Sequence, residues 1–251
     1  MKKNLLVTTL ALAALTAGPA LSEMRRDALG QSFASDSITV PVMANNPGLQ
    51  NAVFATHVSL MNPTGRGFNV VVSLYDANGN KQEKTIALAA GELKVYENFL
   101  GTVFDFSGAG TVKFKSGGGD ELFIVVAEVY TAGSDLRFGT SVPNLDFPAS
   151  GAPSFSPGIN VNTSQRANIG CFNETGRTNV VHATLRDGDG RQVTTFDMEL
   201  AANAWGQRGV PANVNGGYVE FRPDGPADCY AVVVHNSAND GRFIQAIEYA
   251  P

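Results

Sequence analysis

Two cysteines are the residues of this sequence best suited to covalent chemistry. Cys171 and Cys229 are the only cysteines among 251 residues. In an oxidising compartment two such thiols form a disulfide by default, whereas in a reducing one both stay free. A bond between them would close a loop of 58 residues, which in the chain-entropy model is worth about 4 kcal/mol. We expect the disulfide; two free buried thiols are the alternative.

Two short acidic segments carry the oxygen atoms that calcium prefers. They read Asp76-Ala-Asn-Gly-Asn80 and Asp187-Gly-Asp-Gly-Arg191. A helix-loop-helix calcium loop needs Gly at its sixth position and Glu at its twelfth, but the first segment has Lys81 and Ala87 there. Asx and Gly residues also accept the positive φ angles of tight hairpin turns. We therefore expect two turns and no metal site.

Motifs of nucleophilic, zinc or phosphate chemistry are missing from the sequence. It contains no Gly-x-Ser-x-Gly, no His-Glu-x-x-His and no phosphate-binding loop. The three histidines, His57, His182 and His235, are far apart, and a lone histidine on a strand is usually a surface residue. Nothing marks a pair of glycosidase carboxylates either. We expect no catalytic residues, no cofactor and therefore no enzyme.

Trp205, the only tryptophan, is the candidate for stacking on a ligand. An indole ring on an exposed strand can bind the apolar face of a sugar, which would make a polysaccharide the partner. Large aromatic residues are more often part of the core. The sequence leaves both roles open for Trp205.

An internal repeat determines how these residues are placed. Residues 54–143 recur, in diverged form, as residues 167–248. The segments Thr56–Gly65 and Leu74–Gly79 match Ala167–Gly176 and Leu185–Gly190 at a constant offset of 111 residues, and later segments match at 107 and 105. In this alignment Cys171 takes the place of Leu60, and Cys229 that of Leu122.

Each copy contains short apolar segments separated by turn residues, which is typical of β-strands. Within 68–75, for example, Val70, Val72 and Leu74 point to one face and their neighbours to the other. The strands expected in the first copy are 38–42, 56–61, 68–75, 85–88, 93–96, 111–115, 122–130 and 138–142. No segment keeps a helical period over three turns.

This pattern predicts an all-β protein of two tandem immunoglobulin-like antiparallel β-sandwich domains, at residues 38–147 and 148–251. If Leu60 and Leu122 face the first core from opposite sheets, Cys171 and Cys229 face the second core in the same way. Their separation resembles that of the inter-sheet disulfide in immunoglobulin domains.

Three motifs of the first copy resemble a repeat found in exported bacterial proteins of unassigned function. They are Phe54-x-Thr-x-Val-x-Leu-x-Asn-Pro63, Leu74-Tyr-Asp-x-x-Gly79 and Leu88-x-Ala-Gly91. The second copy is similar, although Glu174 replaces Pro63. The resemblance implies a β-sandwich accessory or surface module, and its motifs are turns and core positions that transfer no catalytic residue.

The first 22 residues are typical of an export signal. Lys2 and Lys3 precede an apolar run from Leu5 to Ala17, and small residues end at Ser22. We expect a signal peptide at 1–22, a short segment at 23–37 and export to the periplasm or the extracellular space. The apolar run is too short for a comfortable membrane span.

Charge argues against some classes of partner. Loss of the two signal lysines would take the formal charge from −5 to −7. Nucleic acid or anionic lipid as the main partner would need clustered Lys and Arg, which this acidic chain lacks.

One strand in each copy is apolar at successive positions. We expect Leu122, Ile124 and Val126 to point inward, and Phe123 and Val125 outward. In the second copy Tyr230 and Val232, followed by Val234, are expected to point outward. Because the outer strand face of an isolated sandwich should be polar, the first two outward residues of each copy form a candidate interaction surface. The other copy, segment 23–37, a second subunit or a neighbour in an assembly could cover it.

Two function classes follow from the sequence. The first is an exported, non-catalytic structural or interaction protein, acting in adhesion, matrix or envelope by self-association or by binding another envelope or extracellular protein. The alternative is a carbohydrate-binding module that uses Trp205.

Overall fold

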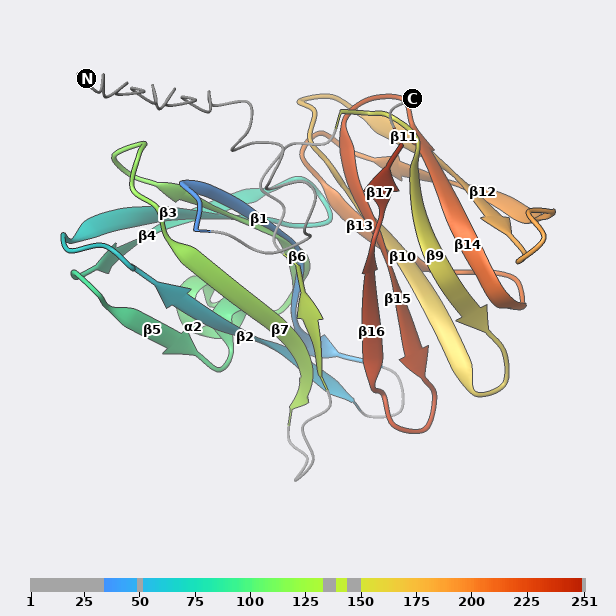
Figure 1. Ribbon diagram of the computed structural model, residues 1–251, viewed down its shortest axis with the longest axis horizontal. Helices are drawn as coiled ribbons and strands as arrows, with labels where there is room; N and C mark the ends of the chain where they lie inside the picture. The colour runs from blue at the N-terminus through green and yellow to red at the C-terminus, as the bar shows by residue number, and fades with distance from the viewer. Residues whose placement is uncertain (1–33, 49–51, 133–138, 144–149, 250–251) are drawn as a thin grey trace, which may run out of the picture. The chain divides into compact units, whose positions relative to one another are not determined.

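The computed structural model of the protein describes residues 34–48, 52–132, 139–143 and 150–249, and from Ala34 onward the chain forms one compact unit (Figure 1). The predicted signal peptide and residues 23–33 of the predicted N-terminal segment lie outside the described residues. The described part is all-β, with every named strand pairing antiparallel, so the predicted fold class is confirmed at that level.

The first repeat has eight strands that pair in the order β4-β3-β6-β1-β2-β7-β8, with β5 joined to β2. Its elements are β1 (Ser37–Pro47), β2 (Val53–Met61), β3 (Phe68–Tyr75), β4 (Lys81–Leu88), β5 (Leu93–Tyr96), helix α2 (Phe99–Phe104), β6 (Gly108–Ser116), β7 (Ile124–Ala132) and β8 (Gly139–Val142). Strand β1 pairs with β6 along most of its length and with β2 only at its end.

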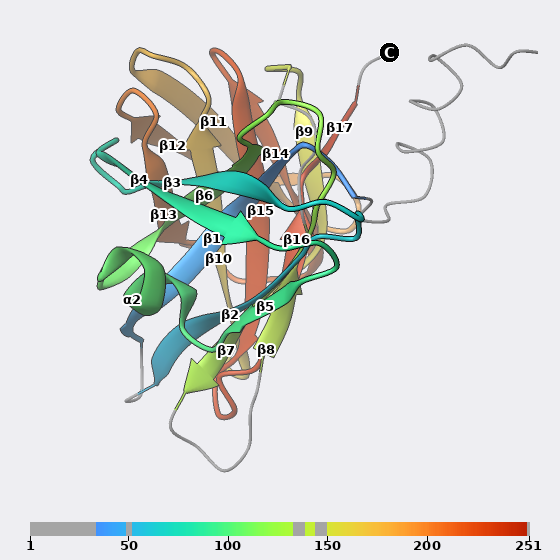
Figure 2. The same ribbon diagram turned by 90° about the vertical axis from the view of Figure 1, so that its left-hand side faces the viewer.

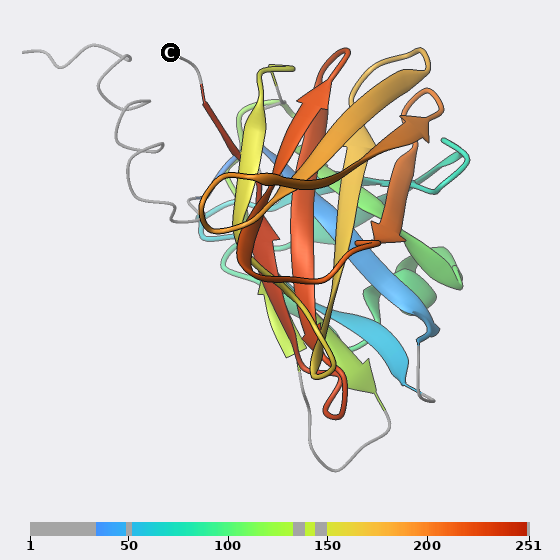
Figure 3. The same cartoon turned by 90° about the vertical axis from the view of Figure 1, so that its right-hand side faces the viewer.

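The second repeat, which runs from yellow to red in Figures 1 and 3, reproduces this order in two separate sheets. Its strands are β9 (Ser154–Val161), β10 (Gln165–Asn173), β11 (Asn179–Arg186), β12 (Gln192–Leu200), β13 (Trp205–Gly209), β14 (Val214–Pro223), β15 (Ala227–His235), β16 (Gly241–Gln245) and β17 (Ile247–Glu248). The order β12-β11-β14-β9 corresponds to β4-β3-β6-β1, and β13-β10-β15-β16 to β5-β2-β7-β8.

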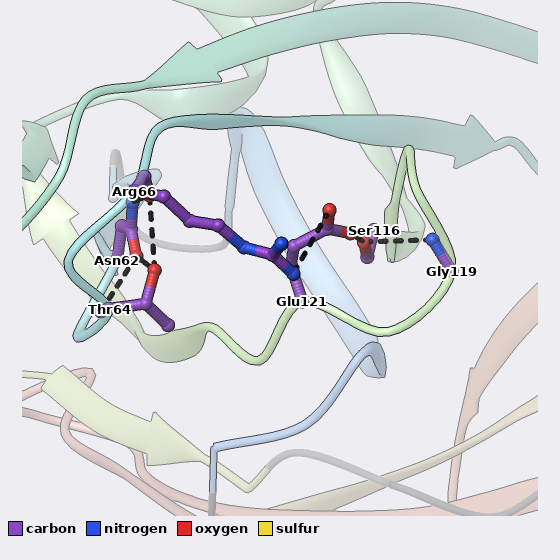
Figure 4. Close-up of polar contacts among 6 residues, drawn as sticks. All are labelled: Asn62, Thr64, Arg66, Ser116, Gly119 and Glu121. Atoms are coloured by element: carbon purple, nitrogen blue, oxygen red, sulfur yellow. Dashed lines mark hydrogen bonds and ion pairs between the residues drawn. The ribbon is translucent and has the colours of Figure 1, made fainter.

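Matched asparagines explain why the Asn-containing motifs recur. Asn62 donates through its amide to the carbonyl of Arg66 at 2.8 Å and accepts from the N–H of Thr64 (Figure 4). The same amide donates to the carbonyl of Ala89, also at 2.8 Å. Asn173 makes the corresponding bonds to Arg177 and Ala201, both at 2.7 Å. Both asparagines are completely buried, so each side chain satisfies backbone groups that water cannot reach.

The two acidic segments are hairpin turns, as predicted. Oδ1 of Asp76 accepts from the N–H groups of Asn78 and Asn80, and Oδ1 of Asp187 accepts from those two and four residues further on. The turns join β3 to β4 and β11 to β12. Because each Asp carboxylate already accepts hydrogen bonds from backbone N–H groups of its own turn, the spacing of the acidic and amide residues in these segments is explained without a bound cation.

Helix α2 was not predicted. It has six residues, and Asn98 caps it by accepting from the N–H of Gly101 at 3.1 Å. Phe99, Leu100 and Phe104 are buried in the first repeat. A helix this short cannot show a period over three turns, so tertiary packing, rather than pattern, fixes it.

The predicted disulfide between Cys171 and Cys229 is present, but it is not an inter-sheet bridge. The two cysteines are directly paired on the adjacent strands β10 and β15 of one sheet, with their Cα atoms 4.1 Å apart. In the first repeat the corresponding pair on β2 and β7 is Leu60 and Val125. Cys229 therefore corresponds to Val125, and the sequence alignment with Leu122 was wrong by three residues.

This error also reversed the predicted faces of β7. Phe123 and Val125 are completely buried, whereas Leu122 and Val126 are 41% and 53% exposed. Because side chains alternate along a strand, an odd shift in alignment exchanges its two faces. The prediction that Phe123 and Val125 point outward is therefore wrong.

The apolar pair at the equivalent position of the first repeat suggests a replacement for the disulfide that the second repeat should tolerate. Cys171→Ala with Cys229→Ala should lower the free energy of unfolding by about 2–5 kcal/mol in urea titrations, through loss of the cross-link and of buried volume. Cys171→Leu with Cys229→Val copies the pair at Leu60 and Val125 and should recover part of that loss. Equal stability of the two double variants would contradict the structural equivalence.

Candidate functional site

The outer face of the β13-β10-β15-β16 sheet carries a group of aromatic residues. Tyr230 and Phe172 are 0% and 1% exposed, although they lie on the face opposite the buried cysteines. Trp205 and Phe243 are partly buried, and these two pack with Tyr230 against the hydrophobic core cluster of the first repeat. This face, which we call the docking face, is therefore covered within the chain.

A chain of hydrogen bonds holds the centre of the docking face. The indole N–H of Trp205 donates to the hydroxyl of Tyr230 at 3.0 Å, and that hydroxyl donates to Oε1 of Gln207 at 2.9 Å. The ring of Tyr230 stacks on Phe243 with centroids 4.9 Å apart. Burial raises the pKa of Tyr230 far above its usual value, so the phenol remains a neutral donor.

Glycine leaves room for this tyrosine. Gly170 is the pairing partner of Tyr230, and a Cβ atom on Gly170 would lie 2.3 Å from the tyrosine ring. In the first repeat the corresponding pair is Ser59 and Val126. The large side chain of Tyr230 therefore fills the space that the missing side chain of Gly170 leaves.

The first repeat meets the docking face through its β3–β4 turn and through β6. Tyr75 packs on Phe172 with centroids 5.4 Å apart, and the backbone N–H of Trp205 donates to the carbonyl of Asp76 at 3.1 Å. The ammonium group of Lys113 lies 4.8 Å from the ring centre of Phe172. These contacts join residues that are 59 (Lys113 and Phe172) to 129 (Asp76 and Trp205) positions apart in the sequence.

Two acidic residues accompany this contact. Lys113 forms an ion pair with Glu174, whose charge also acts on the buried Asp228. Burial raises the pKa of Asp228 well above its usual range, and the charge of Glu174 raises it further. The raised pKa favours the protonated, neutral form of Asp228, whose Oδ2 atom has no hydrogen-bond partner among the described residues.

The corresponding face of the first repeat is exposed. It is formed by β5, β2 and β7, which lie side by side in Figure 2. Nine large hydrophobic residues are exposed in the described part of the chain, and five of them lie here. The five are Met61 (36%), Leu93 (56%), Val95 (52%), Leu122 (41%) and Val126 (53%). We call this set the free face.

Register shows that the two faces are equivalent. Met61 pairs with Leu93 as Phe172 pairs with Trp205. Val126 pairs with Ser59 as Tyr230 pairs with Gly170. The same surface of the module is thus buried in one copy and uncovered in the other.

The residues predicted for the site lie in different parts of the structure. Tyr230 and Val232 lie on the docking face, where Tyr230 is buried and Val232 partly buried. Phe123 and Val125 lie in the first core and do not join them. Trp205 is packed between the repeats, with its N–H group already bonded. The prediction missed Met61, Leu93 and Val95, although the alternation along β5 and a correct alignment would have shown them.

A polar cluster next to the free-face residue Leu122 has a structural role. Ser116 donates to Glu121, whose carboxylate also lies 3.8 Å from the guanidinium of Arg66 (Figure 4). The hydrogen bond from Ser116 lowers the pKa of Glu121, which makes this carboxylate a poor general base. The cluster fixes the loop that leads into β7.

Metal and membrane sites have no support in the described residues. Within the ranges that the structure describes, no three His, Cys, Asp or Glu side chains are grouped to hold a metal ion. In the same ranges no helix has the length and apolar character needed to cross a membrane.

Comparison with known proteins gives no family. No protein-family model and no curated protein matches the chain. Among solved structures, a beta-glucuronidase 2 of Bacteroides uniformis, covalently bound to cyclophellitol-6-carboxylate aziridine, matches at 11% identity and a TM-score of 0.16. The match covers 77% of this chain and 24% of that one, and a TM-score so low carries no argument.

Asp228→Asn tests the protonated carboxyl group. In the unfolded chain Asp228 loses its proton near pH 4, whereas the folded protein retains it, so the free energy of unfolding falls as pH rises through that range. Asparagine mimics the protonated form at every pH. The variant should therefore melt above the wild type at pH 7, with about 2–4 °C for each kcal/mol regained, and the difference should vanish towards pH 4.

Asp120→Asn, at an exposed loop position, makes the same change of side chain in solvent and should leave the melting temperature within a degree or so of the wild type. Destabilisation by Asp228→Asn at pH 7 would show that Asp228 is ionised in the folded protein.

Two glycine turns allow a matched test of the contact between the repeats. Gly79 and Gly190 occupy equivalent turns with φ of 78° and 81°. A Cβ atom on Gly79 would lie 2.2 Å from the carbonyl oxygen of Ala202, whereas one on Gly190 would meet only the hydroxyl of Tyr218, at 3.7 Å. Both substitutions by alanine strain the turn by about 1 kcal/mol.

Gly79→Ala should cost at least about 1 kcal/mol more than Gly190→Ala in the free energy of unfolding, because it also displaces the second repeat. Chemical denaturation of both variants measures the difference. Equal costs would mean that the turn does not press on Ala202.

Proposed function

We propose that this chain is an exported, non-catalytic interaction protein of the envelope or extracellular matrix, built from two immunoglobulin-like β-sandwich domains. The free face of the first repeat is its binding surface. The observation that carries the proposal is the gathering of five exposed apolar side chains on the one face whose counterpart is buried in the second repeat.

Export is supported by the sequence of the first 22 residues and by the disulfide. Bonds between cysteines persist mainly in oxidising compartments. The apolar segment and its basic start have the pattern of a cleavable signal.

The partner that fits the free face best is a second copy of the chain. The module already buries this face against another module of its own kind, through Phe172 and Tyr230. A two-fold contact uses one patch on both copies and needs no further docking surface. Glu92 and Lys94 lie beside the patch as a 3.4 Å ion pair, so its rim carries both signs of charge and two rims need not repel.

The carbohydrate-binding alternative has less support. A stacking platform needs an open ring face, whereas Trp205 is partly buried and bonded to Tyr230. Stacking by Trp205 remains a prediction of the sequence.

Sedimentation of the oxidised protein across a range of concentrations tests the proposal. The weight-average mass should rise reversibly above that of a monomer. Val126→Lys should raise the dissociation constant of self-association by at least about tenfold, because a charge replaces an apolar side chain at the centre of the contact.

Val193→Lys is the matched control, since Val193 is 39% exposed on β12, away from the free face. This variant should associate like the wild type. A wild-type chain that stays monomeric at every concentration, or two lysine variants with the same effect, would overturn the proposal.

A further inference from the structure

A cavity of about 280 Å³ lies beside the docking face. It is walled mainly by apolar side chains, with Trp205 and Phe243 from the second repeat and Val42 and Val129 from the first. Its size is near the lower end of the range of small-molecule sites, which are typically apolar with a few polar groups that fix orientation. The wall is therefore suited to the apolar body of a small ligand.

Arg166 is the charged residue in this wall. Its guanidinium donates to Oδ1 of Asn236 at 3.2 Å and to Oδ1 of Asn239 at 2.8 Å, and both acceptors are neutral amides. Among the described residues, no carboxylate forms an ion pair with it. Burial lowers the pKa of Arg166, so the cation is partly removed from water without a counter-ion.

The two asparagines hold Arg166 in place without neutralising it. A guanidinium has five N–H groups, and the bonds to Asn236 and Asn239 use two of them. The remaining N–H groups have no acceptor among the described residues and can bind a carboxylate, which arginine recognises through two parallel hydrogen bonds.

Arg166 is also particular to this copy of the module. By register its counterpart in the first repeat is Ala55, since Ala55 pairs with Tyr130 as Arg166 pairs with Val234. Ala55 is 4% exposed. The shared strand pairing therefore does not require a cation here, and a long charged side chain replaces a small buried one where the cavity opens.

We propose that this cavity binds a small amphipathic carboxylate, with its anionic group on Arg166 and its apolar body against Trp205 and Phe243. The inference does not rest on the proposed self-association, because the free face and the cavity have no residue in common. Neutral sugars are a poorer fit, since they would leave the guanidinium without an anion.

The test uses benzoate and octanoate as anionic probes, with benzamide as the neutral match of benzoate. Trp205 is the only tryptophan, so its indole N–H gives one resonance, which reports the cavity directly in proton–nitrogen spectra. Both anions should shift that resonance in a saturable way, and benzamide should bind at least about tenfold more weakly than benzoate, because a charged hydrogen-bonded pair is worth more than 1.4 kcal/mol.

Arg166→Gln should reduce benzoate affinity to that of benzamide. Arg208→Gln is the control, since Arg208 is an exposed arginine on β13, outside the cavity. It should bind benzoate like the wild type, and the thermal melting of both variants shows whether they fold.

Three outcomes would overturn the proposal. They are no shift of the Trp205 resonance with either anion at millimolar concentration, equal affinity for benzoate and benzamide, and unchanged benzoate binding by a folded Arg166→Gln variant. Binding of a neutral sugar with no preference for anions would instead assign the cavity to the carbohydrate-binding alternative.

Discussion

Tyr230 lies on the outer face of its own sheet and is nevertheless completely buried, because the first repeat covers it. Burying a tyrosine requires a partner for its hydroxyl, and the bonds to Trp205 and Gln207 supply that partner. The rest of the contact is arranged around this side chain. Gly170 leaves space beneath it, Phe243 stacks on it, and the β3–β4 turn is placed next to Trp205.

The same packing leaves two modules of equivalent strand order with different exposed surfaces. In the second repeat the docking face is covered by the first repeat, and the cavity with Arg166 lies at the edge of that face. In the first repeat the equivalent face remains uncovered, with aliphatic residues in place of the aromatic ones. Docking of one repeat on the other thus covers the docking face of the second repeat and leaves the equivalent free face of the first repeat without a partner. This uncovered face is the physical basis of the proposed association.

Local features of the structure could be predicted from the sequence, whereas features that depend on packing could not. The strands at 68–75 and 93–96 have the predicted bounds, because alternation and turn residues are local signals. The disulfide was predicted from the oxidising compartment and from the internal repeat.

The late strands were misaligned because Leu122 was matched to Cys229, although Ala127 and Val129 match Ala231 and Val233 at the correct offset. That shift of three residues exchanged the core and the surface of β7. Burial of Tyr230 and partial burial of Trp205 arise only when the two copies meet, so no period within either copy encodes them.

A double-mutant cycle on Tyr75 and Phe172 tests the internal docking most directly. The two rings come from different repeats and have centroids 5.4 Å apart. If the first repeat covers the docking face, the combined alanine variant should be less destabilised than the sum of the single variants, with a coupling of about 0.5–1.5 kcal/mol in the free energy of unfolding. Strict additivity of the two substitutions would show that the rings do not pack together in solution and would contradict the account.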